Sequence, residues 1–240
     1  MFRFFKNVRQ KLASENKVMA YLRYAIGEII LVVIGILIAL QINNWKENIK
    51  NNEVENNILK NIRSDLVLQL ETINEQILFE DSTIIKIDSA AIFLSSSLSL
   101  EMLNSLLLDL TIRRTFVANK TSYVSMNDNG EKNLIQNTKL QNEIVQYYQR
   151  LDYVTQVVNN NNLFIVSGQF SSFVSNNTLN IRLNENGSFD NNQKLRPEGR
   201  LLLKNQLSRR KEVSTSNQEF CISQLEATKN LIQLIDNELD

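Results

Sequence analysis

The feature that most constrains this chain is the stretch YLRYAIGEIILVVIGILIALQINNW, which runs from Tyr21 to Trp45. Its centre, Ile29 to Leu40, is twelve residues long and has no polar side chain. A helix rises 1.5 Å per residue, so the 22 residues from Tyr21 to Ile42 would cover about 33 Å. That length matches a hydrocarbon core of about 30 Å. The stretch therefore predicts a transmembrane helix over residues 21–45.

The charges on either side of this helix predict its orientation. Residues 1–24 hold six basic side chains and one acidic side chain, whereas the remaining residues hold 20 basic and 25 acidic ones. A basic segment before an apolar span favours a cytoplasmic N-terminus, so residues 46–240 would be exported. Residues 1–20 would form either a basic cytoplasmic tail or an amphipathic helix on the lipid surface. The exported part has no basic stripe, which argues against nucleic-acid binding.

A cleavable signal peptide is the alternative explanation of the apolar stretch. The residues after Ala39 do not form a small-residue cleavage site, and the basic segment before the apolar run is long. Arg23 and Trp45 instead stand where interfacial anchors are expected. We therefore favour an uncleaved signal-anchor over residues 21–45.

Two features within the span would support contacts with another helix. Gly27, Leu31, Gly35 and Ala39 recur every four residues, which leaves a groove of small side chains with Gly35 and Ala39 at its centre. Glu28 is a carboxylate in an apolar setting, which is costly unless it finds a partner or water. Because Glu28 lies about one turn after Arg23, it would either reach the cytoplasmic interface or contact a membrane partner.

The anchor resembles the N-terminal signature of a family of uncharacterised single-pass membrane proteins from Gram-negative bacteria. The resemblance is carried by GEIILVVIGILIALQINNW, by TSYVSMNDNGEKNLIQNTKLQNEIVQYYQRL from Thr121 to Leu151, and by the closing LIQLIDNEL. It implies an inner-membrane protein with an exported helical domain and no assigned activity.

The residues after Trp45 predict a mainly α-helical bundle. Glycine and proline are scarce, with six and one in the chain, which favours long helices. The membrane helix would continue into a stalk helix of about thirty residues with one narrow apolar stripe. Such a stripe suits either a seam with another subunit or, as we prefer, the core of a bundle. The stripe comprises Val54, Ile58, Ile62, Leu66, Leu70, Ile73 and Ile77.

The rest of the chain predicts helices separated by polar turns. Residues 83–110 would form two shorter helices around Ser95–Ser97, and 111–130 a loop. Residues 139–174 would form one long helix, with Leu140, Ile144, Tyr147, Leu151, Val154 and Val158 on one face. The alternation near 178–190 is consistent with a small β-hairpin. A final helix would begin at Pro197 and end near Glu238.

Composition argues against an enzyme. The chain has no His and only one Cys, Cys221, so the commonest general base and the usual zinc ligands are missing. Cys221 would be either a small buried residue or a link between two chains. The run Asn127 to Gly130 fails the calcium-loop pattern, because Ser125 and Gln136 occupy its first and twelfth positions. We expect no metal and no cofactor.

A tyrosine cluster offers the best candidate for a ligand pocket. Tyr147, Tyr148 and Arg150 would bind a small molecule between helices, or would be core residues. The basic pairs Arg113-Arg114 and Arg209-Arg210 would each bind an anion or, as we prefer, be solvated surface.

These observations predict an anchored interaction or scaffold protein without enzymatic activity. It would contact membrane lipid and associate with itself, or with another membrane protein, through the anchor and stalk. The alternative is a periplasmic bundle that senses a small ligand. Its cytoplasmic tail would be too short for an effector domain, so it would signal through a partner.

Overall fold

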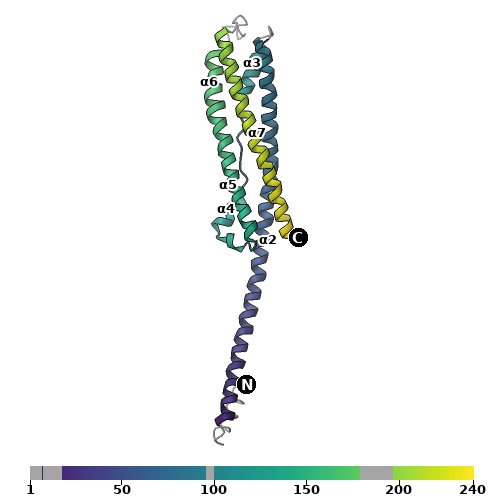
Figure 1. Ribbon diagram of the computed structural model, residues 1–240, viewed down its shortest axis with the longest axis vertical. Coiled ribbons are helices and arrows are strands. Elements are labelled where there is room, and N and C mark those ends of the chain that lie inside the picture. The colour runs from purple at the N-terminus through teal and green to yellow at the C-terminus, as the bar shows by residue number, and fades with distance from the viewer. Residues whose placement is uncertain (1–6, 8–17, 96–99, 179–196) are drawn as a thin grey trace, which may run out of the picture. The chain divides into compact units, whose positions relative to one another are not determined.

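The computed structural model describes residue 7 and residues 18–95, 100–178 and 197–240. Within these residues every assigned element is helical and no β-strand occurs, so the all-α prediction is confirmed (Figure 1). The chain divides into two compact units, Met1–Glu55 and Asn56–Asp240. The expected hairpin near 178–190 and the expected N-terminal amphipathic helix lie outside the described residues, apart from Thr178 and from residues 7 and 18–20.

The first unit contains the beginning of helix α2, which runs from Val18 to Ser95. The large apolar side chains from Ile29 to Leu40 are 47–63% exposed. One apolar helix in the described residues is long enough to cross a membrane, and its most apolar window has no buried residue.

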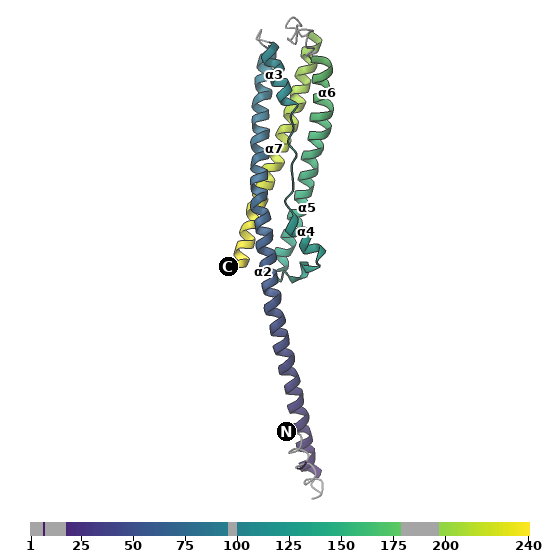
Figure 2. The same cartoon turned by 180° about the vertical axis from the view of Figure 1, so that it is seen from behind.

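The second unit is a bundle in which α2 packs beside α5, Thr138–Asn160, and α7, Pro197–Leu239 (Figures 1 and 2). The apolar stripe of α2 lies in its core, since Ile58, Ile62 and Leu66 are buried. Ion pairs of Arg63 with Asp236, 2.5 Å, and of Asp88 with Lys211, 2.6 Å, show that α2 and α7 run antiparallel. These three stripe residues therefore contribute to the core of the bundle.

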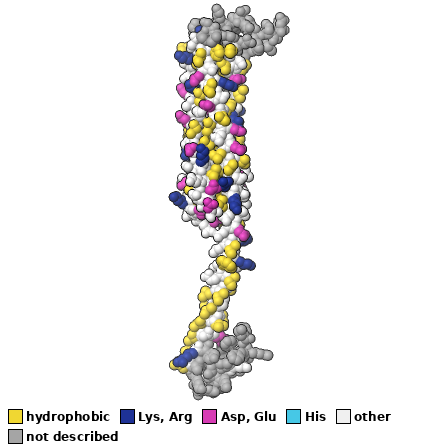
Figure 3. Space-filling model, turned by 90° about the vertical axis from the view of Figure 1, so that its right-hand side faces the viewer, with side chains coloured by type: hydrophobic (Ala, Val, Ile, Leu, Met, Phe, Trp, Pro, Cys, Tyr) yellow, Lys and Arg dark blue, Asp and Glu magenta, His cyan; other side chains and the backbone are white. Residues whose placement is uncertain are grey.

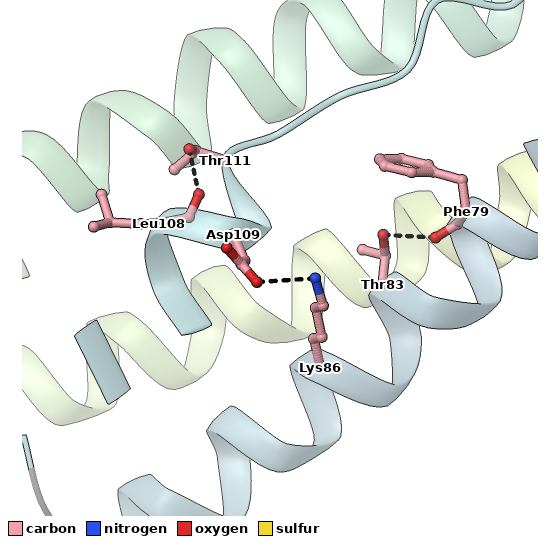
Figure 4. Close-up of polar contacts among 6 residues, drawn as sticks. All are labelled: Phe79, Thr83, Lys86, Leu108, Asp109 and Thr111. Atoms are coloured by element: carbon pink, nitrogen blue, oxygen red, sulfur yellow. Dashed lines mark hydrogen bonds and ion pairs between the residues drawn. The ribbon is translucent and has the colours of Figure 1, made fainter. Parts of the chain in front are cut away.

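Helix α3, Leu100–Leu110, returns along the end of α2. Its apolar residues join a cluster with α2, α7 and the segment that follows α5. Lys86 Nζ lies 2.9 Å from Asp109 Oδ2, and Thr111 donates to the carbonyl of Leu108 at the end of α3 (Figure 4). Of the expected turn at Ser95–Ser97, only Ser95, the last residue of α2, lies within the described residues. The first of the two predicted short helices is the end of α2. The cluster comprises Ile87, Ala90, Leu103, Leu107, Leu110, Phe170, Val174, Leu203 and Leu207.

The prediction that 111–130 is a loop is wrong in its second half, because residues Thr121–Asp128 form helix α4. The residue before α4, Lys120, provides no side-chain cap. Instead, the carboxylate of Asp65 on α2 accepts a hydrogen bond from the Ser122 N–H at 2.7 Å. An acidic group at a helix N-terminus is stabilising. The cap comes from a distant helix, so the local sequence does not reveal it.

Residues 112–120 have no regular structure and pass between the helices, where side-chain amides bind their backbone. Asn159 on α5 accepts from the Phe116 N–H and donates to the Phe116 carbonyl, both at 2.9 Å. Asn162 donates to the carbonyl of Arg114 at 2.6 Å, and Gln69 on α2 accepts from the Asn119 N–H at 2.7 Å. Buried backbone groups need such partners when no helix or sheet supplies them.

The predicted helix 139–174 is present, but it changes from an α-helix to a π-helix along its length. Helix α5 begins after Asn137, whose side chain accepts from the N–H groups of Lys139 and Leu140 at 3.1 Å. After α5 the chain forms π-helix η2, Asn161–Phe170, then α6, Ser171–Phe173, and η3, Val174–Thr178. The six residues predicted for one face of α5 are all buried, and the final helix lies where it was expected.

We predict that Asn159→Leu destabilises the bundle because it removes both bonds to the Phe116 backbone. Leaving buried polar groups unpaired costs about 1–3 kcal/mol, or a fall in melting temperature of about 2–10 °C. Circular dichroism of the purified full chain measures this change. Asn160→Leu is the matched control, because Asn160 is exposed. Equal melting temperatures for the two variants would contradict the assigned role of Asn159.

Candidate functional site

The anchor segment of α2 presents the small residues predicted for helix contact. Space-filling representation shows hydrophobic side chains along this segment (Figure 3). A Cβ atom built on Gly27 or on Gly35 would meet no other atom within 4 Å. Ala39 and Trp45 are exposed, Trp45 at 66%. Arg23 is also exposed, whereas Glu28 is half-buried and has an interaction partner. The groove of small residues is therefore open along this face.

The tyrosine cluster lies where α4, α5 and α7 meet. Tyr148 stacks on Tyr123 with ring centroids 4.1 Å apart, and Tyr147 meets Tyr148 edge-on at 5.1 Å. The Tyr147 hydroxyl is 3.0 Å from Thr228 Oγ1 on α7. Because the Thr228 hydroxyl donates its single proton to the Gln224 carbonyl, the hydroxyl of Tyr147 is the donor to Thr228.

Burial is the largest influence on the pKa values of the Tyr147 and Tyr148 hydroxyls. It raises the pKa of Tyr147, and the hydrogen bond with Thr228 opposes this only in part. Burial also raises the pKa of Tyr148, with the nearby Tyr147 and Asp65 adding to the shift. Both tyrosines are therefore neutral packing residues at physiological pH. This arrangement suits the core interpretation of the pair better than a role in proton transfer.

A surface groove does lie between α5 and α7, beside Tyr147 and Arg150. Its volume is about 400 Å³, within the range of small-molecule pockets. Tyr148 does not line it, since its side chain is fully buried on the other side of the pair. Arg150 extends over the groove and donates to the Ser223 hydroxyl on α7. The lining residues are Glu143, Gln146, Tyr147, Arg150, Ala227, Asn230, Leu231 and Leu234.

The structure places Cys221 in the bundle interior, with a relative exposure of 0%. Burial, aided by the charge of Glu80, raises the pKa of its thiol to about 12. A buried, protonated thiol is unreactive. This agrees with the interpretation of Cys221 as a small packing residue.

The sequence analysis missed a buried polar layer that we define by Gln76, Glu80, Arg210, Ser214 and Asn217. All five side chains are 0% exposed. Glu80 Oε1 accepts from Gln76 at 2.8 Å and from Asn217 at 3.1 Å. Arg210 donates to the Leu110 carbonyl at 3.3 Å and to the Ser214 hydroxyl. Burial lowers the pKa of Arg210, and the charge of Glu80 opposes that shift.

The expectation that both basic pairs are solvated is therefore wrong for Arg210. Its neighbour Arg209 is exposed, and Arg114 of the other pair forms an ion pair with Glu75. The buried layer was visible in the sequence as polar residues on the seven-residue pattern of the α2 and α7 core. Only their partners could not be inferred.

Asn127 to Gly130 form the end of α4 and a turn, with Gly130 at a φ of 69°. This left-handed conformation favours glycine. Among the described residues, no three Asp, Glu, Cys or His side chains gather as metal ligands would.

Comparison with known proteins gives a family and nothing further. A search of curated proteins and a search of solved structures each found no match. A family model matches residues 28–196, which include most of the anchor, the bundle helices α3 to α5 and the π-helical segment. The chain belongs to this family, DUF6090, a family of unknown function.

Proposed function

We propose that this protein is a membrane-anchored helical bundle that acts as an interaction or scaffold protein and catalyses no reaction. The observation that carries the proposal is the exposure of every large apolar side chain from Ile29 to Leu40. Burying one such side chain is worth about 1.5–3 kcal/mol, so this surface requires an apolar environment. A bilayer supplies it over the length of the segment.

The charge distribution supports one orientation. Six basic residues precede the span, and the positive-inside rule would keep them in the cytoplasm. The span would be a single uncleaved signal-anchor in a bacterial inner membrane. The bundle of residues 56–240 would then lie in the periplasm.

Self-association through the anchor follows from the open face of Gly27, Gly35 and Ala39. Small residues at four-residue spacing allow the backbones of two membrane helices to approach closely. The proposed contact rests on the anchor alone, because the core side chains of the α2 stripe are buried inside their own bundle. Another membrane protein with a similar face would compete for the same groove.

The groove beside Tyr147 and Arg150 favours a second candidate, a periplasmic sensor for a small ligand. It combines an apolar wall from α7 with a guanidinium and a carboxylate from α5. Native mass spectrometry of the full chain in detergent tests this candidate. A small molecule that copurifies with the wild type and is lost in Arg150→Ala would favour the sensor over the scaffold.

We predict that the full chain stays in the membrane pellet after alkaline carbonate extraction. Replacing Val33 and Ile36 by Lys together should release it, since each Lys at the centre of a span costs about 2.5–3.5 kcal/mol. The matched control replaces Leu78 and Ile85 by Lys, because these apolar residues are exposed in the bundle. A wild-type protein found in the soluble fraction, or shortened near Ala39, would contradict the anchor.

We predict a disulfide-linked dimer for Gly35→Cys in a Cys221→Ala background. The Cys at position 35 would face the partner helix across the small-residue groove. Leu37→Cys is the matched control, because position 37 lies about 200° around the helix from position 35. Oxidation of isolated membranes followed by non-reducing electrophoresis detects the dimer. Equal dimer formation at the two positions, or none at either, would rule out association through this face.

A further inference from the structure

Six side chains in the bundle interior each leave one polar atom without a hydrogen-bond partner among the described residues. Each of the six residues is 0% exposed. Leaving so many buried atoms unpaired would cost as much as the whole folding free energy of a typical domain. A partner that the described residues do not supply would offset this cost. The atoms are Gln69 Nε2, Gln76 Oε1, Glu80 Oε2, Tyr148 Oη, Asn162 Oδ1 and Arg210 Nη2.

Exchanging the oxygen and nitrogen of the amides would not remove the problem. Gln69 Oε1 accepts from the Asn119 N–H, and Asn162 Nδ2 donates to the Arg114 carbonyl, so backbone partners fix both amides. Gln76 Nε2 donates to the Glu80 carboxylate, and the exchanged amide would set two oxygens against each other. The unpaired atoms are thus a property of the fold.

Two of these atoms belong to Glu80 on α2 and Arg210 on α7, and the charge of Glu80 acts on Arg210. Glu80 Oε1 is held by Gln76 and Asn217, while Oε2 is unpaired. Arg210 is held through Nε and Nη1, while Nη2 is unpaired. The negative charge of Glu80 affects the pKa of Arg210. However, no hydrogen bond joins Glu80 Oε2 to Arg210 Nη2.

The free atoms define what the site would bind. The guest must accept a hydrogen bond from Arg210 Nη2 and donate to Glu80 Oε2, and Gln76 Oε1 offers a second acceptor. An anion would be repelled by the carboxylate and a cation by the guanidinium, so the guest is neutral. Complete burial of the surrounding side chains leaves no path for a larger molecule. A water molecule has two donors and two acceptors and is small enough.

We propose that the bundle interior contains a water-binding site in which ordered water bridges Glu80 on α2 to Arg210 on α7. The same residues reach the end of α3 through Leu110 and the start of the π-helix through the bond between Asn217 and Asn161, 2.8 Å. Bound water would therefore connect these four parts of the bundle. A unit of this size commonly holds several buried waters, about one per 27 residues.

Nuclear magnetic resonance of the full chain in detergent micelles, with ¹⁵N-labelled arginine, tests the site directly. Arg210 is fully buried, so its side-chain N–H protons should exchange slowly and show a cross-peak to long-lived water. Labelled Arg209→Lys and Arg210→Lys variants assign the signal to one residue or the other. Slowly exchanging Arg210 protons without a water cross-peak would overturn the proposal.

Stability measurements on Arg210→Met, Glu80→Gln and the double variant test the charge coupling across the water. Removing one partner of a buried pair leaves the other uncompensated, so Arg210→Met should lower the melting temperature by about 10 °C. Adding Glu80→Gln to it should restore part of that loss. Arg209→Met, the exposed neighbour, should have little effect. Additive effects of the two core substitutions would mean that Glu80 and Arg210 are not coupled and would also overturn the proposal.

Discussion

The bundle depends on hydrogen bonds for the polar side chains that lie at core positions of its two longest helices, α2 and α7. Buried residues of α2 and α7 recur at steps of three and four, the spacing at which two helices pack along one seam. In the middle of that seam the residues are polar on both helices. On α2 they are Gln69, Gln76, Glu80 and Thr83, and on α7 they are Arg210, Ser214, Asn217, Gln224 and Thr228.

Polar residues in such a seam give specificity at the expense of stability. A sliding of α7 by one turn would keep most apolar contacts but would separate Asn217 from Glu80 and Arg210 from Leu110. A buried group that loses its partner costs about 1–3 kcal/mol, and more when it is charged. Since a domain is stable by only about 5–15 kcal/mol, few such losses are tolerated. The polar layer therefore fixes the register of α2 and α7, as a buried Asn does in coiled coils.

The irregular segment 112–120 and the π-helix also depend on hydrogen bonds made by buried polar side chains. Asn159 and Asn162 must reach the backbone of residues 114–116, and Asn161 must reach Asn217. From Val158 the buried residues recur at every fourth position, through Asn162 and Val166 to Phe170. In an α-helix each such step overshoots the turn by about 40° and would carry this line away from the core. A π-helix has more residues per turn, which opposes this drift.

The sequence predicts those parts of the fold that depend on local periodicity. Pro197 and the apolar spacing after it place α7, and the face of α5 that contains Ile144 and Leu151 is correctly identified. Ile58, Ile62, Leu66 and Ile73 of the α2 stripe are buried as predicted. Leu70 and Ile77 are half-buried, and the core there follows Gln69 and Gln76 instead. A search for apolar residues cannot identify a core position that is occupied by glutamine.

The parts that the sequence does not predict are those in which one segment completes another. Helix α4 is capped by Asp65, which precedes it by more than fifty residues, and Arg210 differs from exposed Arg209 only in the face of α7 that it occupies. The groove between α5 and α7 is likewise completed by a second segment. Tyr147 and Arg150 were identified from their helix, but the opposite wall, with Leu231 and Leu234, exists only after α7 has packed.

The two units place their apolar and polar residues in opposite ways, and this contrast limits what each unit can do. In the first unit the large apolar side chains from Ile29 to Leu40 face outward and Gly35 and Ala39 lie among them, so recognition there would depend on shape. In the second unit polar side chains lie inside and their geometry is fixed by hydrogen bonds. The proposed contacts with lipid or with another membrane helix therefore belong to the first unit. The polar layer of the second unit is where α2, α3, α7 and the π-helix share hydrogen bonds.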